Sequence, residues 1–270
     1  MLRVQWVAVV GLSFWLVLNA TVKANAHNGQ ALAPHDLWSA WNWEPLLLGG
    51  LALSAWFYGR AVYSLWQRAG VGRSVRPTQV VAFAAGLTAL FVALVSPLDA
   101  LSDSLFAAHM VQHILLMNVA APLLVWGTQP SLPLWALPQS TRRSVAHWWH
   151  GQRILQQFWR WLCRPFVLWL LYAAVLWIWH LPIFYQAALR NEAVHLGEHA
   201  GFFGSSLLLW WRLRRDIQPS SYNDGVAILF LFTTALHSGL LAALITFAPQ
   251  PLYPLYATTV AAWGFTPLSD

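Results

Sequence analysis

Residues 108–127 read AHMVQHILLMNVAAPLLVWG, an apolar stretch whose ionisable residues are two histidines. A helix of ~20 such residues crosses the ~30 Å hydrocarbon core of a bilayer. His109 and His113 are four positions apart, and this spacing puts both imidazoles on one face of the helix. The stretch therefore predicts a membrane-spanning helix that carries an ionisable stripe.

The composition of the whole chain extends this conclusion to the entire molecule. Hydrophobic residues make up 58% of the 270 residues and charged residues 9%, against about 25% charged residues in a typical soluble domain. So few charges exclude a water-soluble enzyme and a nucleic-acid-binding protein, and the net charge of +6 fits the basic cytoplasmic loops of a membrane protein. Because an isolated strand leaves its backbone unpaired in lipid, we expect an all-α, polytopic transmembrane helical bundle.

Six apolar stretches after residue 26 are long enough to cross a bilayer, which takes ~20 residues. The predicted spans are 45–66, 78–96, 105–127, 165–182, 190–213 and 223–247. We expect residues 27–270 to form a single transmembrane helical domain.

Residues 1–26 have the pattern of a secretory signal peptide. Arg3 is followed by an apolar run over residues 4–18, and residues 24–26, Ala-Asn-Ala, match a cleavage site of the A-x-A type. The alternative is a retained first span, for which the apolar run is slightly short. Cleavage would make His27 the first residue of the mature chain, where its imidazole and the α-amine together can chelate copper.

The distribution of charge between the predicted spans indicates the orientation. Arginines gather in alternate loops: Arg68, Arg73 and Arg76; Arg142, Arg143, Arg153, Arg160 and Arg164; and Arg212, Arg214 and Arg215. The opposite loops hold Arg190 and the acids Asp36, Glu44, Asp99, Asp103 and Glu192. Because basic loops face the cytoplasm, we expect a multi-pass protein of the cell membrane whose mature N-terminus and histidine cluster are extracytoplasmic.

Two further segments are apolar or amphipathic but do not read as spans. Residues 140–162 mix arginine with tryptophan and predict an amphipathic helix on the cytoplasmic surface, or alternatively an element that docks a partner. Residues 251–270, PLYPLYATTVAAWGFTPLSD, predict a re-entrant or interfacial segment.

Six of the ten histidines are predicted in the outer half of the membrane, on four spans: His109, His113, His180, His195, His199 and His237. At a rise of 1.5 Å per residue, His113 and His199 lie ~13 Å inside the outer boundary and His237 ~15 Å inside it. Ionisable groups at such depth are expensive and usually mark ion paths or binding sites. The set predicts a convergent site, with separate interhelical hydrogen bonds as the alternative.

The side chains available in this set favour copper. Imidazole suits copper, zinc, iron and nickel, and a thioether selects for Cu(I). Met117 lies four residues after His113 and extends the same stripe, either as a ligand or as packing. We therefore expect Cu(I). The single cysteine, Cys163, falls in a predicted cytoplasmic loop and excludes a thiolate cluster or an internal disulfide.

Three acidic residues lie close to the predicted site in the sequence. Glu198 is expected to accept a hydrogen bond from a ligating imidazole or to carry a proton. Asp99 and Asp103 are expected at the outer lip, where they would attract cations. The alternative for Asp103 is to cap the helix that follows it.

Three other functions stay open at this point. Haem held by His113 and His199 would make the protein a membrane oxidoreductase, but it leaves the neighbouring histidines without a role. A copper transporter would need ligands in the inner half of the membrane, where the sequence places none. A metal-free scaffold would use the histidines for packing alone.

Longer stretches of the sequence resemble a known family. Residues 108–127, 176–211 (LWIWHLPIFYQAALRNEAVHLGEHAGFFGSSLLLWW), 236–256 (LHSGLLAALITFAPQPLYPLY) and 34–45 (PHDLWSAWNWEP) are similar to the CtaG-type cytochrome c oxidase assembly factors of the caa-type oxidase group. The resemblance covers residues 34–270 in order. It implies a polytopic helical membrane protein, without enzymatic activity, that takes part in the maturation of a haem–copper oxidase.

The resemblance also implies that copper comes from an extracytoplasmic donor and is delivered to cytochrome c oxidase subunits in the bilayer. It carries the metal-ligand role over to His109, His113, Met117, His180, His195, His199 and His237. Members of this family usually continue past a TPLSD-like turn into a further span, whereas this sequence stops at Asp270. We expect either a naturally short member or a missing C-terminal span, whose loss would open one flank of the bundle.

Overall fold

The computed structural model describes residues 32–129, 132–216 and 224–270, and within these ranges the chain forms helices and no strand. The prediction of an all-α fold is confirmed. The predicted signal peptide over residues 1–26 and His27 lie outside the described residues.

Helices occupy all six regions predicted as spans. They are α2 (Pro45–Ala69), α3 (Pro77–Leu94), the run of α5 (Phe106–Ile114), η2 (Leu115–Ala120) and α6 (Ala121–Gly127), α10 (Pro165–Trp179), α12 (Glu192–Asp216) and α13 (Asp224–Thr246). The shorter elements are η1 (Pro34–Ser39), α4 (Pro97–Ser102), α7 (Leu132–Trp135), α8 (Gln139–Gly151), α9 (Arg153–Leu162), α11 (Pro182–Arg190), η3 (Pro254–Thr258) and η4 (Val260–Trp263). Several begin at a proline, because its fixed φ and missing N–H suit the first helical position.

Within the part of the chain that the structure describes, three helical runs are both long and apolar enough to cross a membrane. They are Pro77–Leu94, Phe106–Gly127 and Gly225–Thr246, and the pair Arg153–Leu162 and Pro165–Trp179, bent by 73°, would add a fourth. Helices α2 and α12 have 25 residues each, which at 1.5 Å per residue gives ~37 Å and is also sufficient. Both are more polar than the three runs named above and are not among the candidate spans. The number of six spans therefore stays a prediction.

The predicted span over residues 105–127 is one continuous run with a π-helical segment in its middle. The amide of Ala121 donates to the carbonyl of Leu116, five residues earlier. Pro122 comes next and has no N–H to donate. A wider turn ahead of the proline accommodates its ring and its missing donor without breaking the helix.

The predicted span over residues 190–213 begins two residues later, at a defined cap. The side-chain oxygen of Asn191 accepts from the backbone amides of Ala193 and Val194, at 2.9 and 3.2 Å. Asparagine is a favoured residue at this position because its side chain satisfies amides that have no partner in the first turn. The residues before Asn191 belong to the separate helix α11.

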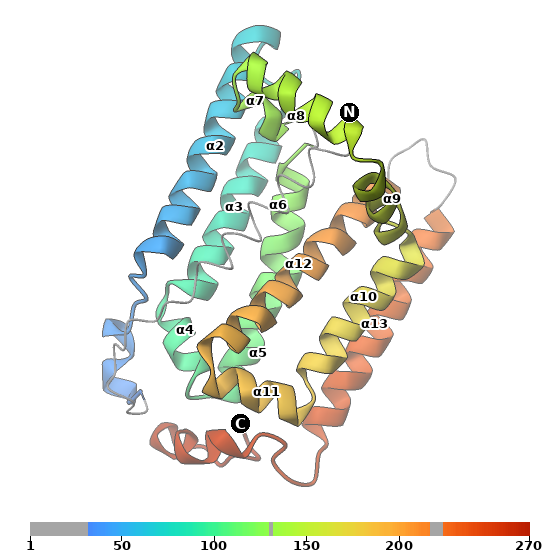
Figure 1. The fold of residues 1–270 in the computed structure, drawn as a ribbon. Helices are drawn as coiled ribbons and strands as arrows, with labels where there is room; N and C mark the ends of the chain where they lie inside the picture. Colours follow the sequence, from blue (N-terminus) through green and yellow to red (C-terminus); the bar gives the residue numbers. More distant parts are fainter. Residues whose placement is uncertain (1–31, 130–131, 217–223) are drawn as a thin grey trace.

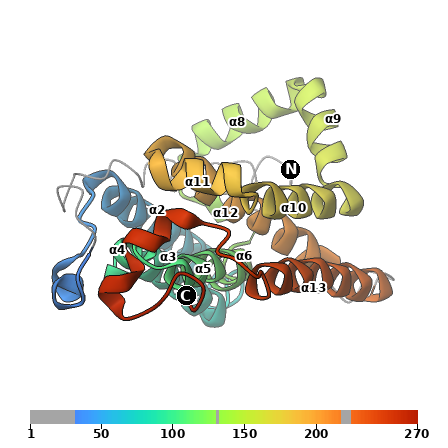
Figure 2. The same cartoon turned by 90° about the horizontal axis from the view of Figure 1, so that it is seen from below.

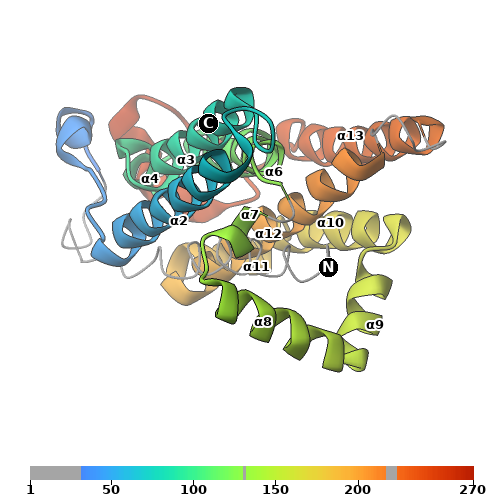
Figure 3. The same ribbon diagram turned by 90° about the horizontal axis from the view of Figure 1, so that it is seen from above.

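The long helices run side by side along one direction, and short elements lie across both ends of the bundle (Figure 1). Helices α8 and α9 cover one end and meet at an angle, as the view in Figure 3 shows. The predicted amphipathic helix is therefore two helices. In α9, Ile154 and Phe158 are exposed while Trp159 is buried, and this exposed apolar face suits the interface of a membrane.

Helices α3 and α6 approach each other closely at two glycines. A Cβ on Gly127 would lie 2.5 Å from the backbone nitrogen of Phe83, and one on Gly86 would lie 2.8 Å from Cγ of Leu124. Small residues let helix backbones come together in lipid, where dispersion contacts replace the hydrophobic effect as the driving force. At the same end of α6, Arg214 from α12 donates to the carbonyls of Val125 and Thr128.

The C-terminal tail, residues 247–270, folds back across the end of the bundle opposite α8 and α9 (Figures 1 and 2). It is joined to the bundle by hydrogen bonds from Tyr256 to the carbonyl of Ser102 (3.1 Å) and from Thr259 to the carbonyl of Ser104 (2.8 Å). The carboxylate of Asp270 accepts from the amides of Phe106 and Ala107, at 2.7 and 3.1 Å.

These contacts correct the alternative given for Asp103, that it caps the helix that follows it. Helix α5 starts after Leu105, which makes no side-chain cap, and the amides of its first turn bond to Asp270 instead. The position of the tail relative to a membrane surface stays a prediction.

Candidate metal centre

Two helices supply the buried polar cluster. Helix α5 carries His109 and His113, and helix α12 carries His195, Glu198 and His199. The exposed fractions of these five residues are 0, 4, 6, 0 and 2%, respectively. The two i, i+4 pairs keep a shared face because α5 is a regular helix as far as Ile114 and the π turn begins only after it.

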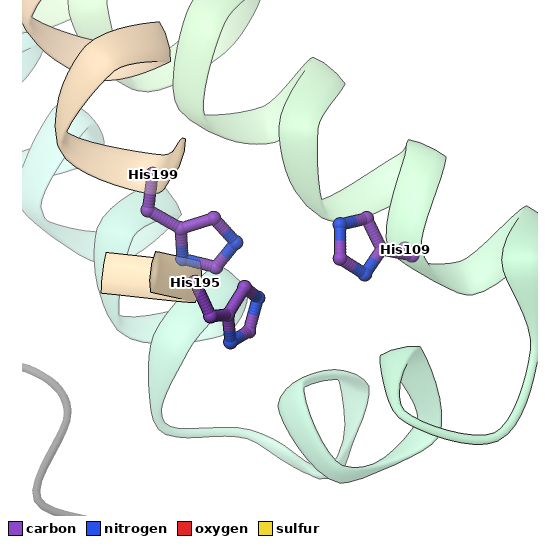
Figure 4. Close-up of side chains that lie close together, drawn as sticks. All are labelled: His109, His195 and His199. Atoms are coloured by element: carbon purple, nitrogen blue, oxygen red, sulfur yellow. The ribbon is translucent and has the colours of Figure 1, made fainter. Parts of the chain in front are cut away.

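The four imidazoles pack directly against one another. Ring centres lie 4.3 Å apart for His109 and His113, 4.2 Å for His195 and His199, and 5.4 Å for His109 and His195 across the two helices. Figure 4 shows the rings of His195 and His199 directed from one helix toward His109 on the other. The predicted convergence of these four histidines is therefore present in the structure.

Among the described residues, two groups of donor atoms have the spacing of a metal site. In one, which we call the imidazole position, one ligand atom each from His109, His195 and His199 lies within 4.8 Å of the others. In the second, the carboxylate position, the same holds for His109, His113 and Glu198. His109 belongs to both positions.

The cluster contains polar atoms that the fold does not satisfy. Within the described residues, both ring nitrogens of His113 and both carboxylate oxygens of Glu198 have no hydrogen-bond partner. Oε2 of Glu198 lies 3.6 Å from Nε2 of His109, which is too long for a good hydrogen bond. Buried polar groups without partners cost about 1–3 kcal/mol each, and a bound cation would satisfy them.

His180 lies beside the cluster, immediately after α10. Its Nδ1 donates to the carbonyl of Leu176 at 2.7 Å, which leaves Nε2 as the nitrogen that can take a metal. The ring centres of His180 and His113 are 6.2 Å apart. His180 is half-buried and belongs to neither of the two donor groups, so it is a neighbour of the site.

Met117 and His237 occupy different surroundings from the four clustered histidines. Met117 packs in an apolar group with Tyr172, Leu176 and Phe202, and Phe202 in turn contacts the ring of His113 at 4.5 Å between centres. His237 on α13 lies against Trp169 on α10, with ring centres 5.5 Å apart. Their role as ligands stays a prediction.

The acid expected at the outer lip, Asp99, is instead buried in a hydrogen-bond network. Its carboxylate accepts from Asn42 at 3.0 Å and from Gln112 at 2.9 Å. Gln112 also donates to the carbonyl of Ala93 at 2.8 Å. This network joins α3, α4 and α5 and holds the helix turn that bears His109 and His113. Exposed His35, by contrast, pairs with Asp36 at 3.3 Å on η1.

Tyrosines that the sequence did not single out connect the tail to the cluster. Tyr185 on α11 lies 5.1 Å from the ring of His109, stacks on Tyr253 at 4.0 Å, and pairs with the hydroxyl of Tyr256 at 3.0 Å. Burial raises the pKa of Tyr256 well above its usual value, so its hydroxyl stays protonated and donates to Ser102. Tyr253 donates to the carbonyl of His180 at 2.8 Å. Tyr253 and Tyr256 belong to the LYPLY motif of residues 252–256, which is the sequence feature that could have pointed to them.

Comparison with known proteins identifies a family. A family model described as cytochrome c oxidase caa3 assembly factor matches residues 56–270. That range includes every residue of the two donor groups. A search of curated proteins and a search of solved structures each returned no match.

Proposed function

The chain belongs to the cytochrome c oxidase caa3 assembly factor family, and on that premise we propose that it binds Cu(I) and delivers it to an oxidase subunit. The observation that carries the proposal is the cluster of four buried imidazoles and Glu198 between α5 and α12. Three or four nitrogen donors without thiolate are a ligand set that copper accepts readily.

The charge of the cluster supports a monovalent ion. A bare carboxylate in a buried, apolar bundle is expensive unless an opposite charge accompanies it. Cu(I) brings one positive charge, and Glu198 supplies one negative charge within the same buried cluster. A copper-loaded site with neutral imidazoles is therefore close to electroneutral, as a site inside a bilayer should be.

The packing of the rings favours a small ion over haem. A porphyrin between His113 and His199 would need a wide planar slot. The two ring centres are 5.4 Å apart and their planes nearly perpendicular, at 86°. His109 and His195 fill the adjacent space, each within 4.3 Å of a neighbouring ring centre.

The expected partners follow from this role. Copper would be received from an extracytoplasmic donor and passed to a subunit of the oxidase. We expect the end of the bundle that carries the tail to face the extracytoplasmic side, because the arginine-rich loops lie at the opposite end. The function is one of assembly, without a chemical transformation of a substrate.

Metal analysis with an absorption spectrum on the full chain in detergent tests the proposal. We expect about one copper per chain after loading with Cu(I) under reducing conditions, and no Soret band. The double variant His113→Ala with His199→Ala should lower the copper content, because it removes a donor from each of the two donor groups. His147→Ala, an exposed histidine on α8, is the matched control and should leave the copper content unchanged.

Three results would contradict the proposal. Normal copper content in the double variant would place the metal elsewhere. A Soret band would favour a haem-binding oxidoreductase. Absence of both copper and haem would leave a metal-free scaffold for oxidase assembly as the better explanation.

A further inference from the structure

We propose that the cluster holds one copper ion at two alternative positions that share His109, and that the ion passes between them without leaving that ring. The inference rests on the proposed copper-binding function and deepens it. The imidazole position comprises His109, His195 and His199, and the carboxylate position comprises His109, His113 and Glu198. Each is a complete three-donor set, with all ligand atoms within 4.8 Å of one another.

The place of His109 in the structure makes it the shared ligand. It is fully buried, and neither of its ring nitrogens has a hydrogen-bond partner within the described residues. Its ring centre lies 4.3 Å from His113 on its own helix and 5.4 and 6.1 Å from His195 and His199 on α12. No hydrogen bond would have to break for this ring to turn toward one position or the other.

The two positions differ in the chemistry of their donors. Three imidazoles suit Cu(I), whereas a carboxylate oxygen is a harder donor that suits it less well. We therefore assign the imidazole position as the resting place of the ion and the carboxylate position as the one that holds it more weakly. In the carboxylate position, His113 and Glu198 take the place of His195 and His199 as ligands. The carboxylate also compensates the charge of the ion there.

This arrangement fits delivery better than a single rigid site. A protein that must surrender its ion needs a path on which ligands are exchanged one at a time, so that no step exposes a bare ion to an apolar interior. A shared His109 provides that continuity. It also predicts one ion per chain, because both positions draw on the same ring.

Cu(I) affinity measured by competition with a chromophoric Cu(I) chelator, on the full chain in detergent, tests the inference. If the ion can bind at either of two alternative positions, the total Cu(I) binding constant is the sum of the constants of the two positions. If all the ligands form one composite position, each ligand multiplies the single binding constant by its own factor. Loss of one position therefore leaves the other in use. We expect His195→Ala and Glu198→Ala each to retain one bound ion, and the two together to lose at least ~10-fold more affinity than the product of the single losses.

Two further variants make the pattern specific. His195→Ala combined with His199→Ala removes two donors of the same position, and should cost little more than His195→Ala alone. His109→Ala removes the shared ligand and should match the His195→Ala, Glu198→Ala pair. His113→Ala provides a second way to disable the carboxylate position, and His147→Ala is the unaffected control.

Losses that multiply for every pair would show a single composite site and overturn the inference while leaving copper binding intact. Two ions bound per wild-type chain would overturn it as well. Wild-type protein that binds no Cu(I) would overturn the proposed function itself, and the inference with it.

Discussion

At the scale of single residues, Glu198 is the side chain whose environment is hardest to explain by packing alone. It is fully buried and its carboxylate oxygens have no hydrogen-bond partner within the described residues. A group in that situation lowers stability by about 1–3 kcal/mol. We therefore expect Glu198→Gln, which keeps the shape and removes the charge, to raise the thermal midpoint of the metal-free protein and to reduce the stabilisation by added Cu(I).

Thermal unfolding in detergent, with and without Cu(I), measures both effects. Asp36→Asn is a suitable control, because it neutralises an exposed acid outside the bundle and should change neither quantity. A lower midpoint for metal-free Glu198→Gln would show that the carboxylate already has a stabilising role without the ion.

At the scale of elements, the contact between α3 and α6 determines where the π turn and the helix that carries His113 sit. The contact depends on the missing side chain at Gly127, since a Cβ there would lie 2.5 and 2.7 Å from backbone atoms of Phe83. Overpacking of this kind typically costs ~1–3 kcal/mol. We expect Gly127→Ala to lower the thermal midpoint clearly, and the backbone of Phe83 cannot relieve the clash by a rotamer change.

Gly49→Ala is the matched substitution. Gly49 also lies in a long helix, but a Cβ there would meet no atom within 4 Å, and alanine favours a helix over glycine by about 1 kcal/mol. The midpoint of Gly49→Ala should therefore equal or exceed that of the wild type. Equal midpoints for the two variants would refute the close approach of α3 and α6.

At the scale of the whole molecule, the tail closes the end of the bundle nearest the histidines. Asp270 bonds to the first turn of α5, and Tyr256 bonds to Ser102 and pairs with Tyr185, which contacts His109. Release of the tail should therefore open a path to the cluster without altering its ligands. We expect Asp270→Ala and Tyr256→Phe to speed the transfer of bound Cu(I) to an external chelator while leaving the equilibrium affinity unchanged.

Rapid-mixing measurements of copper transfer distinguish access from affinity. Thr258→Ala serves as the control, because Thr258 is exposed and its hydroxyl bonds within the tail to the carbonyl of Leu255. Transfer rates equal to the wild type in both tail variants would show that the ion leaves by another route.

Local sequence patterns were enough to place the helices and two halves of the candidate site. Apolar runs of the right length located α2, α3, α5–α6, α10, α12 and α13. This works because a helix in lipid makes all its backbone hydrogen bonds within its own segment. The i, i+4 spacing placed His109 with His113 and His195 with His199 on shared faces for the same reason. The family followed from long motifs in these same segments and was confirmed by comparison.

Only the tertiary structure decided which helix faces meet. It set His109 against His195 and His199, brought Glu198 together with His109 and His113, and put His237 beside Trp169. It also buried Asp99, whose carboxylate accepts hydrogen bonds from Gln112 and Asn42. The first turn of α5 is capped by Asp270, which is more than 160 residues away in the chain. Such contacts arise from packing between distant segments, and helical periodicity within one segment holds no information about them.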